Sequence, residues 1–388
     1  MDTIYLDNNA TTMTAPEVLQ EMLPYFSELY GNPSSMHSFG GQVAEKIREA
    51  RAKVAKLIGA SPDEILFTSC GTESDSTAVM AALNAHPEKK HIVTTKVEHP
   101  AIKSLVEHLG TKGYRTTFVP VDAKGDLDLE FLFDSLDDDT AIVSIMWANN
   151  ETGTIFPIEE IAAQVKKRGI VFHTDAVQAV GKIPLDMANS SVDMLSISGH
   201  KLHGPKGVGA LYIRKGTKFS PMLIGGHQEK GRRAGTENTA SIIGLGKAAE
   251  LAAKNMAKEN LQVAALRDRL EKGLLEKIPN ARINGNPDSR LPNTTNISFE
   301  YVEGEAILLM MNELGICASS GSACTSGSLE PSHVLRAMGV PFTCAHGSIR
   351  FSLSIYNTQE EIDFVIEKLP PVIQRLRDMS PFWADRPQ

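Results

Sequence analysis

The densest group of chemically useful side chains in the sequence is the run SISGHKLHGPKG at residues 196–207. Lys201 follows an apolar stretch there and lies among Ser198, His200 and several glycines. A lysine that acts as a nucleophile must be partly desolvated so that its amine can be neutral, and this setting suits that need. Lys206 is a competing candidate by composition, so position alone does not decide between the two lysines.

A second candidate nucleophile is Cys324, in the run SSGSACTSGSLEPS at residues 319–332. The run is too polar for a core and poor in large side chains. An exposed thiol in such a loop can become a reactive thiolate; the alternative is a surface cysteine with no role. Cys317 has apolar neighbours and is expected to be inert, and no role is assigned to Cys70 or Cys344.

Polar clusters that follow apolar runs are candidates for holding a bound group. Gly71 and Thr72 stand where a helix is expected to begin, and the free N–H groups of a helix N-terminus bind anions. An ordinary helix cap is the alternative. Asp175 ends an apolar run, with Gln178 three residues later. Because a buried carboxylate needs a partner, Asp175 is either the partner of a protonated ring nitrogen or a helix cap.

Histidine, amide and arginine side chains supply the rest of the possible site. His99 precedes a proline and Asn150 follows the apolar run AIVSIMW, although both positions also suit ordinary turns. Arg350 has apolar neighbours in SIRFSLS, where its guanidinium could clamp a carboxylate or close a structural ion pair. The run GRRAGTEN, which contains Thr236, is a further candidate for binding phosphate or carboxylate.

Short apolar runs that alternate with helical patterns must position these residues. Strands are predicted at 64–68, 91–95, 117–121, 141–147, 170–173, 194–197 and 208–213. Several of them are apolar on both faces, as strands between two helix layers must be. Between the runs lie amphipathic stretches such as 42–58, whose apolar residues recur at helical spacing. This alternation predicts an α/β fold with a mainly parallel sheet, and ligands bind beyond the carboxyl ends of such strands.

After about residue 250 the pattern changes. The later elements are predicted as a helix at 261–278, strands near 295–299 and 349–353, and a closing helix at 360–377. Pro370 and Pro371 should kink or break that last helix. We therefore expect a large domain over 13–255 and a smaller α+β domain, formed by 1–12 and 256–388, that carries the cysteine-bearing loop.

Composition excludes several classes of partner. The 388 residues include 39 Lys and Arg against 47 Asp and Glu, a net charge of −8, so we expect binding neither to nucleic acid nor to a membrane. The opening MDTIYLDNNATT has no apolar targeting segment, and no run approaches the ~18 apolar residues of a membrane span. We expect a cytoplasmic protein. The four cysteines lack the spacing of a zinc site, so no resident metal is expected.

Taken in order, the motifs resemble those of cysteine desulfurases, pyridoxal-phosphate (PLP) enzymes of the class V aminotransferase family. The resemblance covers nearly the whole chain, from YLDNNATT and GNPSSMHSFG through HTDAVQAVGK to SIRFSLS. SCGTESDSTA, GRRAGTEN, EGEAILLMMN and the SPFW ending are most similar to the nitrogenase-associated, NifS-type branch. The resemblance implies PLP fold type I, with a seven-stranded, mainly parallel sheet in the large domain.

The resemblance also implies how PLP would be held. Lys201 would bind it covalently, and Asp175 would keep its ring nitrogen protonated, which makes the ring an electron sink. Gln178 would bond the ring hydroxyl, and His99 would stack on the ring and move protons. The full set of cofactor-binding residues would be Gly71, Thr72, His99, Asp175, Gln178, Ser198, His200, Lys201 and Thr236, the last from the partner subunit of a homodimer.

For the reaction, the resemblance implies that Asn150 and Arg350 hold the carboxylate of L-cysteine. Cys324 would take the substrate's sulfur as a persulfide, leaving L-alanine, and pass it to an iron–sulfur scaffold protein that serves nitrogenase. Cys324 could then also ligate an iron–sulfur cluster transiently.

Three other interpretations compete. An aminotransferase or a selenocysteine lyase would share the fold. A non-catalytic subunit is disfavoured because Lys201, Asp175 and Cys324 are all present. A nicotinamide enzyme is excluded because no G-x-G-x-x-G follows the first strand.

Overall fold

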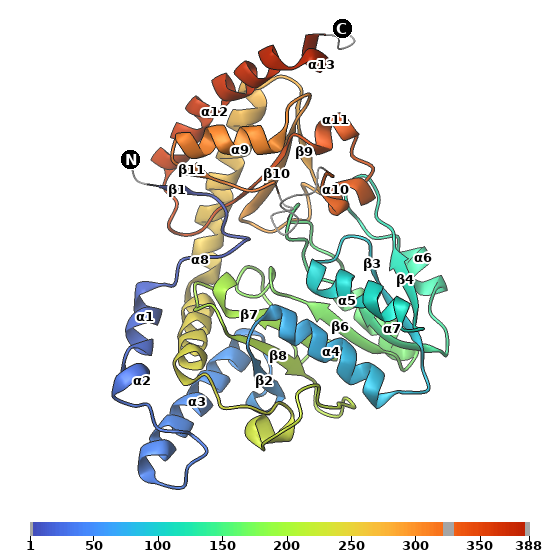
Figure 1. Cartoon of the computed structure of the whole chain (residues 1–388), viewed down its shortest axis with the longest axis vertical. Coiled ribbons are helices and arrows are strands. Elements are labelled where there is room, and N and C mark those ends of the chain that lie inside the picture. The colour runs from blue at the N-terminus through green and yellow to red at the C-terminus, as the bar shows by residue number, and fades with distance from the viewer. Residues whose placement is uncertain (1–2, 321–329, 385–388) are drawn as a thin grey trace.

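The computed structural model describes residues 3–320 and 330–384, which form two parts stacked along the long axis of the molecule (Figure 1). The lower part contains a seven-stranded sheet with helices on both faces. The upper part contains most of the C-terminal third of the chain, together with the N-terminal strand.

The seven-stranded sheet is built from strands that the sequence predicts. They are β2 (Ile65–Thr68), β3 (His91–Thr95), β4 (Arg115–Val119), β5 (Thr140–Ser144), β6 (Val171–Asp175), β7 (Met194–Ser198) and β8 (Gly209–Ile213). The order across the sheet is β2-β8-β7-β6-β5-β3-β4. Only β8 runs against its neighbours, pairing antiparallel with both β2 and β7. The expected mainly parallel sheet is confirmed, and the carboxyl ends of the other six strands share one edge.

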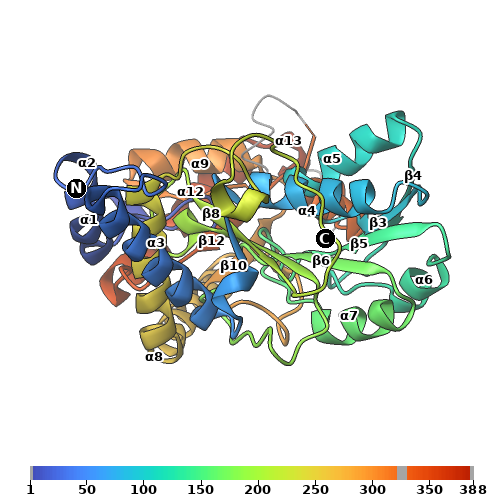
Figure 2. The same cartoon turned by 90° about the horizontal axis from the view of Figure 1, so that it is seen from below.

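Helices cover both faces of this sheet because successive side chains of a strand point to opposite faces. In β2, Leu66 packs with one hydrophobic cluster, while Ile65 and Phe67 pack with another. Figure 2 shows α4 and α5 on the face to which Leu66 points, and α7 on the face to which Ile65 and Phe67 point. The helices and turns of this part are α1 (Pro16–Met22), α2 (Pro24–Ser27), α3 (Ser38–Leu57), η1 (Pro62–Glu64), α4 (Gly71–Ala85), α5 (Pro100–Thr111), α6 (Leu129–Asp134), α7 (Ile158–Lys167), η2 (Gly199–Lys201) and η3 (Gln228–Gly231).

The upper part has its own hydrophobic core and two small sheets. Its elements are β1 (Ile4–Tyr5), β9 (Ala281–Asn284), β10 (Thr294–Phe299), α9 (Gly304–Glu313), β11 (Ile316–Cys317), α10 (His333–Ala337), α11 (Phe342–Ala345), β12 (Ser348–Ser352), α12 (Gln359–Met379) and α13 (Pro381–Ala384). The strands β12, β10 and β9 form an antiparallel sheet, and β1 pairs in parallel with β11. Ile4 and Leu6 pack in this core, so the start of the chain is anchored far from α1.

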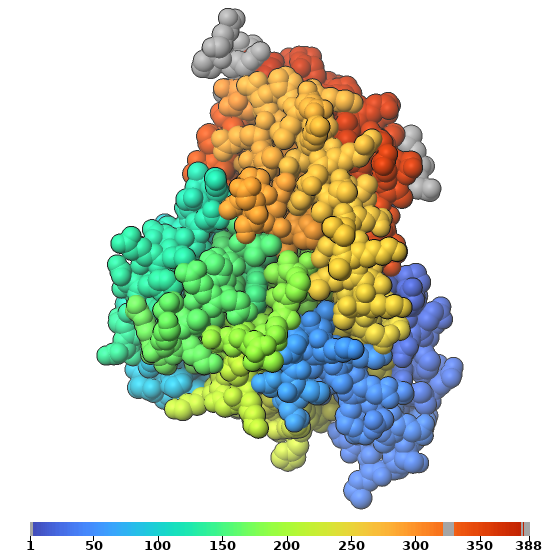
Figure 3. Space-filling model, turned by 180° about the vertical axis from the view of Figure 1, so that it is seen from behind, coloured from blue at the N-terminus to red at the C-terminus, as the bar shows by residue number. Residues whose placement is uncertain are grey.

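A single long helix, α8 (Thr239–Lys277), joins the two parts. Its first half packs in the core of the lower part through Leu245, and its second half packs in the upper core through Leu270. Seen from behind, its surface extends from the N-terminal helices to the upper part (Figure 3). α8 begins at Thr239, well before residue 261, where the sequence predicted the helix to start. The predicted domain boundary at 255/256 falls inside α8, and that division stays a prediction.

The last long helix is not broken by its two prolines. α12 contains Pro370 and Pro371 and continues to Met379. Its buried face, which includes Leu369 and Val372, continues through the prolines and packs in the upper core. Tertiary packing of an apolar face thus outweighs the two missing backbone N–H donors. Of the two expected effects, a kink or a break, the break is wrong.

Candidate active site

A cavity of about 580 Å³ lies at the carboxyl ends of the sheet strands and is lined on the other side by residues of the upper part. It brings together ten residues that the sequence singles out: Gly71, Thr72, His99, Asn150, Asp175, Gln178, Ser198, His200, Lys201 and Arg350. They come from the ends of five strands, from the short segment after β7, and from β12. The shared edge of the sheet explains how residues so far apart in sequence meet.

Lys201 is the last residue of the short helix η2, directly after β7. Its Nζ donates to the carbonyl oxygens of Asn9 at 2.5 Å and Ala10 at 2.6 Å. These contacts place the amine at the wall of the cavity. The competing Lys206 is exposed and does not line the cavity, so the structure favours Lys201.

Asp175 ends β6 and is only 5% exposed. Its Oδ1 accepts a hydrogen bond from the backbone N–H of Val177 at 2.9 Å. Burial raises the pKa of Asp175, while the nearby His99 and the amine of Lys201 act to lower it. A further cation in the cavity would favour the charged carboxylate, because an opposite charge stabilises the ionised form.

His99 caps helix α5 and also lines the cavity. Its Nδ1 accepts from the backbone N–H of Ala101 at 3.2 Å, so the proton of the neutral ring is assigned to Nε2. Burial lowers the pKa of His99, which favours a neutral imidazole. His99 therefore sits in a turn and also faces the cavity, so its position in the turn leaves the predicted site role open.

The start of helix α4 forms a cradle suited to an anion. Gly71 and Thr72 open this 15-residue helix, and a Cβ on Gly71 would lie 3.4 Å from the Cβ of Ser198. The buried Oγ of Ser198 has no hydrogen-bond partner among the residues described. Burial, with the charges of Lys201 and Lys206, lowers the pKa of His200 to about 4. A helix N-terminus, a threonine hydroxyl and an unpartnered serine hydroxyl together fit a phosphate group.

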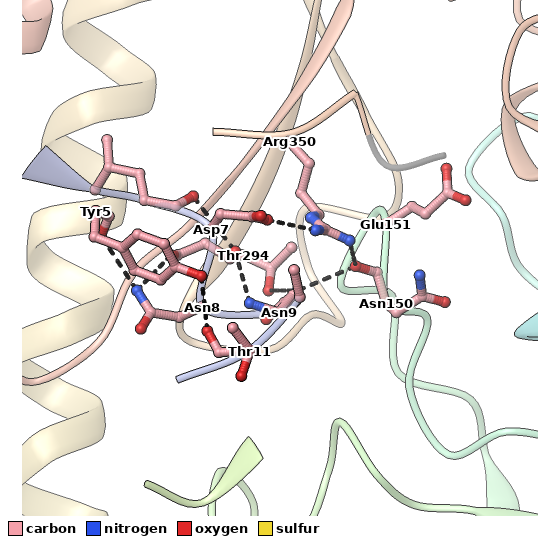
Figure 4. A network of polar contacts seen from close by, with 12 residues as sticks. Tyr5, Asp7, Asn8, Asn9, Thr11, Asn150, Glu151, Thr294 and Arg350 are labelled. Atoms are coloured by element: carbon pink, nitrogen blue, oxygen red, sulfur yellow. Dashed lines mark hydrogen bonds and ion pairs between the residues drawn. The ribbon is translucent and has the colours of Figure 1, made fainter. Parts of the chain in front are cut away.

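Arg350 lies in β12 and is 3% exposed. Its Nη2 donates to Oδ1 of Asp7 at 2.6 Å, and its Nη1 donates to the backbone oxygen of Asn150 at 3.1 Å (Figure 4). Its Nε is buried and, within the described residues, has no partner. Arg350 therefore closes the structural ion pair that the sequence offered as one alternative. Its Nε remains available as a donor, and binding of a carboxylate stays a prediction.

Several contributors to the site were missed by the residue-level interpretation. Asn9 contributes a backbone acceptor for Lys201 and donates from its side chain to Thr294 Oγ1 at 2.9 Å (Figure 4). Ser332 Oγ donates to Oε2 of the buried Glu151 at 2.5 Å. The available signals were YLDNNATT and the end of the run SSGSACTSGSLEPS, which the sequence interpretation includes without giving Asn9 or Ser332 a role.

One predicted site residue, Thr236, is not placed in the cavity, and another falls outside the described part of the chain. Thr236 is exposed and is not among the lining residues. Cys324 lies outside the described residues. On the C-terminal side of that gap, Glu330, Pro331 and Ser332 line the cavity. Within 3–320 and 330–384, no group of three or more His, Cys, Asp or Glu side chains is arranged to hold a metal ion.

The described residues contain no helix that is long and apolar enough to span a membrane.

Comparison with known proteins agrees with the geometry. The chain matches the class-V aminotransferase family over residues 4–365. It is 63% identical over 385 residues to the cysteine desulfurase NifS of Azotobacter vinelandii, covering 99% of this chain and 96% of that protein. A cysteine desulfurase of Trichormus azollae is 62% identical over the same shares.

Solved structures are similar as well. A NifS-like protein superposes with a TM-score of 0.91 at 41% identity, covering 96% of this chain and all of the other. The structure described as SspA in complex with cysteine gives a TM-score of 0.81 at 34% identity, over 92% of this chain and all of that one. The chain therefore belongs to the class-V aminotransferase family and, within it, to the cysteine desulfurases.

Proposed function

We propose that this chain is a PLP-dependent cysteine desulfurase that converts L-cysteine to L-alanine and stores the sulfur as a persulfide on Cys324. The observation that carries the proposal is the cavity, where an amine, a carboxylate, an anion cradle and an arginine face a common space. These are the groups needed to hold an aldehyde cofactor with a phosphate and an amino-acid substrate with a carboxylate.

The described side chains fit PLP. Thr72, Ser198 and the start of α4 would hold its phosphate, with His200 beside them, and the unpartnered Ser198 hydroxyl supports this. Asp175 would pair with the ring nitrogen, since the buried carboxylate is stabilised by a cation.

In the same proposal, Gln178 would bond the ring hydroxyl, His99 would stack on the ring, and Lys201 would hold the cofactor covalently. PLP, when bound, supplies an electron sink for the carbon atoms of the substrate.

The chain's own residues then carry the remaining work. Arg350 and Asn150 bind the carboxylate of cysteine and orient its Cα–H bond toward Lys201. The Lys201 amine takes the Cα proton and returns protons later, and His99 moves protons at its Nε2. The Cys324 thiolate attacks the substrate sulfur, the carbon–sulfur bond breaks with its electron pair left on carbon, and protonation of that carbon completes alanine.

The wider setting belongs to the proposal too. We infer a homodimer in which the exposed Thr236 serves the cavity of the partner subunit, and a large domain over 13–255 with a smaller one from 1–12 and 256–388. An iron–sulfur scaffold protein in the cytoplasm of a nitrogen-fixing cell would accept the sulfur, as the 63% identity to a NifS protein suggests. In this proposal, Cys324 ligates iron only transiently, while the sulfur passes to the scaffold protein.

The test is to incubate the PLP-loaded protein with L-cysteine and to measure alanine together with alkylatable persulfide on Cys324. One alanine per persulfide in the first turnover is expected. Cys324→Ala should keep the visible cofactor band but form no alanine, whereas the control Cys344→Ala should behave as the parent protein. Alanine without a Cys324 persulfide would indicate a lyase that releases sulfide, and a protein that takes up no PLP would refute the proposal.

A further inference from the structure

A second cavity, of about 260 Å³, shares Lys201 with the first. It is also lined by Lys182, a residue to which neither the sequence motifs nor the proposed chemistry gives a role. Lys182 is the last residue of HTDAVQAVGK, seven positions after Asp175. A lysine placed behind a candidate active site needs a reason, because a desolvated ammonium is costly unless it is bonded.

The side chain of Lys182 is tied directly to the site. Its Nζ donates to Oε1 of Gln178 at 3.0 Å. The other end of that amide, Gln178 Nε2, donates to the backbone oxygen of Asn9 at 3.1 Å, and the same oxygen accepts from Lys201 Nζ at 2.5 Å. A continuous chain of hydrogen bonds therefore runs from Lys182 through Gln178 and Asn9 to Lys201.

The backbone around Lys182 is built to hold it in this place. Gly181 has φ of +77°, and a Cβ there would lie 2.5 Å from Cδ2 of Leu202, so the turn requires glycine. The carbonyl oxygen of Lys182 accepts from Asn260 Nδ2, on α8, at 2.5 Å. Lys182 is thus fixed on both sides, by a tight turn and by the long helix.

The charges around Lys182 do not explain it as an ordinary ion pair. Burial, followed by the positive charges of Lys201 and Arg350, lowers the pKa of Lys182 to about 7. Lys182 in turn helps to lower the pKa of His203, another lining residue of the second cavity. The carboxyl groups that line this cavity are those of Glu17 and Glu259, and neither contributes to the shift of Lys182.

A hydrogen-bond donor at this position has one clear consequence for Gln178. An amide can rotate so that its oxygen and nitrogen exchange places, and only its partners decide between the two orientations. Lys182 Nζ donates to the amide oxygen, and in its ammonium form, which prevails below a pKa of about 7, it can only donate. The Asn9 carbonyl can only accept and selects the amide nitrogen. The second N–H of the Gln178 amide is then left for a group in the first cavity.

We propose that Lys182 is a positioning residue that acts through Gln178: it fixes the amide so that an N–H, and not the oxygen, faces the cofactor's ring oxygen. The inference rests on the proposed function for the identity of that ring. Without Lys182, only the Asn9 carbonyl selects the orientation of the Gln178 amide. The amide then turns its oxygen toward an anionic ring oxygen, which repels it, in a larger fraction of the molecules.

The test is a double-mutant cycle on cofactor binding, measured as the Kd of PLP by fluorescence titration and as the position of the visible absorption band. Lys182→Met should weaken PLP binding about tenfold and shift the band, the effect of losing one charge-assisted hydrogen bond. Gln178→Leu should cause a loss of about the same size. In the Gln178→Leu background, Lys182→Met should add less than a twofold loss, because residues that act as one unit are not additive.

Two further variants keep the result interpretable. Lys182→Arg retains a donor and should bind PLP within about threefold of the parent protein, even if Lys182→Met folds poorly. Lys112→Met, at the exposed end of α5 and outside both cavities, is the control and should change nothing. If the parent protein binds PLP but the two losses multiply in the double variant, Lys182 does not act through Gln178. If the parent binds no PLP at all, the proposed function fails instead.

Discussion

Arg350 in β12 donates to Asp7 at 2.6 Å although the two residues are 343 positions apart in sequence. The contact fixes the guanidinium before any substrate arrives, because one edge is occupied by a carboxylate of the protein. A substrate carboxylate therefore meets an arginine whose orientation and charge are already set, with its Nε still without a partner among the described residues.

Removing the charge of Asp7 should destabilise the folded protein. The Asp7 side chain is 19% exposed and that of Arg350 only 3%, so Asp7→Asn leaves a buried cation poorly compensated. We expect a loss of about 1–3 kcal/mol in the free energy of unfolding, measured by urea denaturation. Asp63→Asn, which breaks the exposed pair with Lys230, is the control and should have no measurable effect. Equal midpoints for the two variants would contradict the structural role of Asp7.

Replacing Arg350 by lysine should weaken substrate binding while keeping the charge. A lysine lacks the planar fork that bonds Asp7, Asn150 and a carboxylate together. Arg350→Lys should raise the KM for cysteine roughly 10- to 100-fold, with a smaller change in kcat, in steady-state assays of alanine release. Arg282→Lys, an exposed arginine of the same three-stranded sheet, should leave KM unchanged. A KM that stays at the parent value in Arg350→Lys would exclude this residue as the carboxylate anchor.

Glu98 should make the protein less stable as the pH rises. Burial raises the pKa of Glu98 to about 8, from 4.5, so the folded state holds a proton that the unfolded state has lost. The contribution of Glu98 to the free energy of unfolding is therefore fully present below about pH 4.5, and it is lost as the pH rises through about 8. Glu98→Gln should reduce the fall in thermal midpoint between pH 5 and pH 8, whereas the exposed Glu107→Gln should not. An unchanged pH profile in Glu98→Gln would show that Glu98 is ionised in the folded protein at neutral pH.

Ser332 should stabilise the part of the cavity wall that follows the undescribed residues. Its Oγ donates to Glu151 and accepts from the backbone N–H groups of Val334 and Leu335, the first turn of α10. Ser332→Ala removes the cap and leaves the Glu151 carboxyl without that donor, so we expect a loss of about 1–3 kcal/mol in chemical denaturation. Ser332→Thr keeps the hydroxyl and should recover most of the stability. If threonine fails to do so, packing and not hydrogen bonding explains the effect.

The sequence predicted the sheet well because its strands are buried on both faces. All seven strands predicted before residue 250 belong to the seven-stranded sheet, with bounds that differ by three residues or fewer. The two-residue strands β1 and β11 were not foreseen, since two residues carry no periodicity. The start of α8 was also missed. Its first half is buried on several sides, and such a segment lacks the polar stripe that marks a surface helix.

The candidate site was predicted less completely than the sheet, for a different physical reason. Side chains that follow a strand, such as Asp175 and Lys201, could be found because ligands bind at that edge. The oxygens of Asn9 and Ala10 that hold Lys201 belong to the backbone, and their role depends on tertiary placement and not on residue type. The ion pair between Asp7 and Arg350 is equally invisible to local patterns, since nothing near either residue points to the other.

Residues near the start of the chain meet β12 at the cavity, and this has a consequence for how the protein is made. Residues 65–213 contain every strand of the large sheet, so a nascent chain can build that sheet long before synthesis ends. The segment that holds Asp7 and Asn9 can take its final position only after β12 has left the ribosome, because Asp7 pairs with Arg350 of that strand. A chain that stops short of β12 can thus contain the lysine and the anion cradle and still lack the carboxylate anchor, so incomplete products of translation should be unable to desulfurate cysteine.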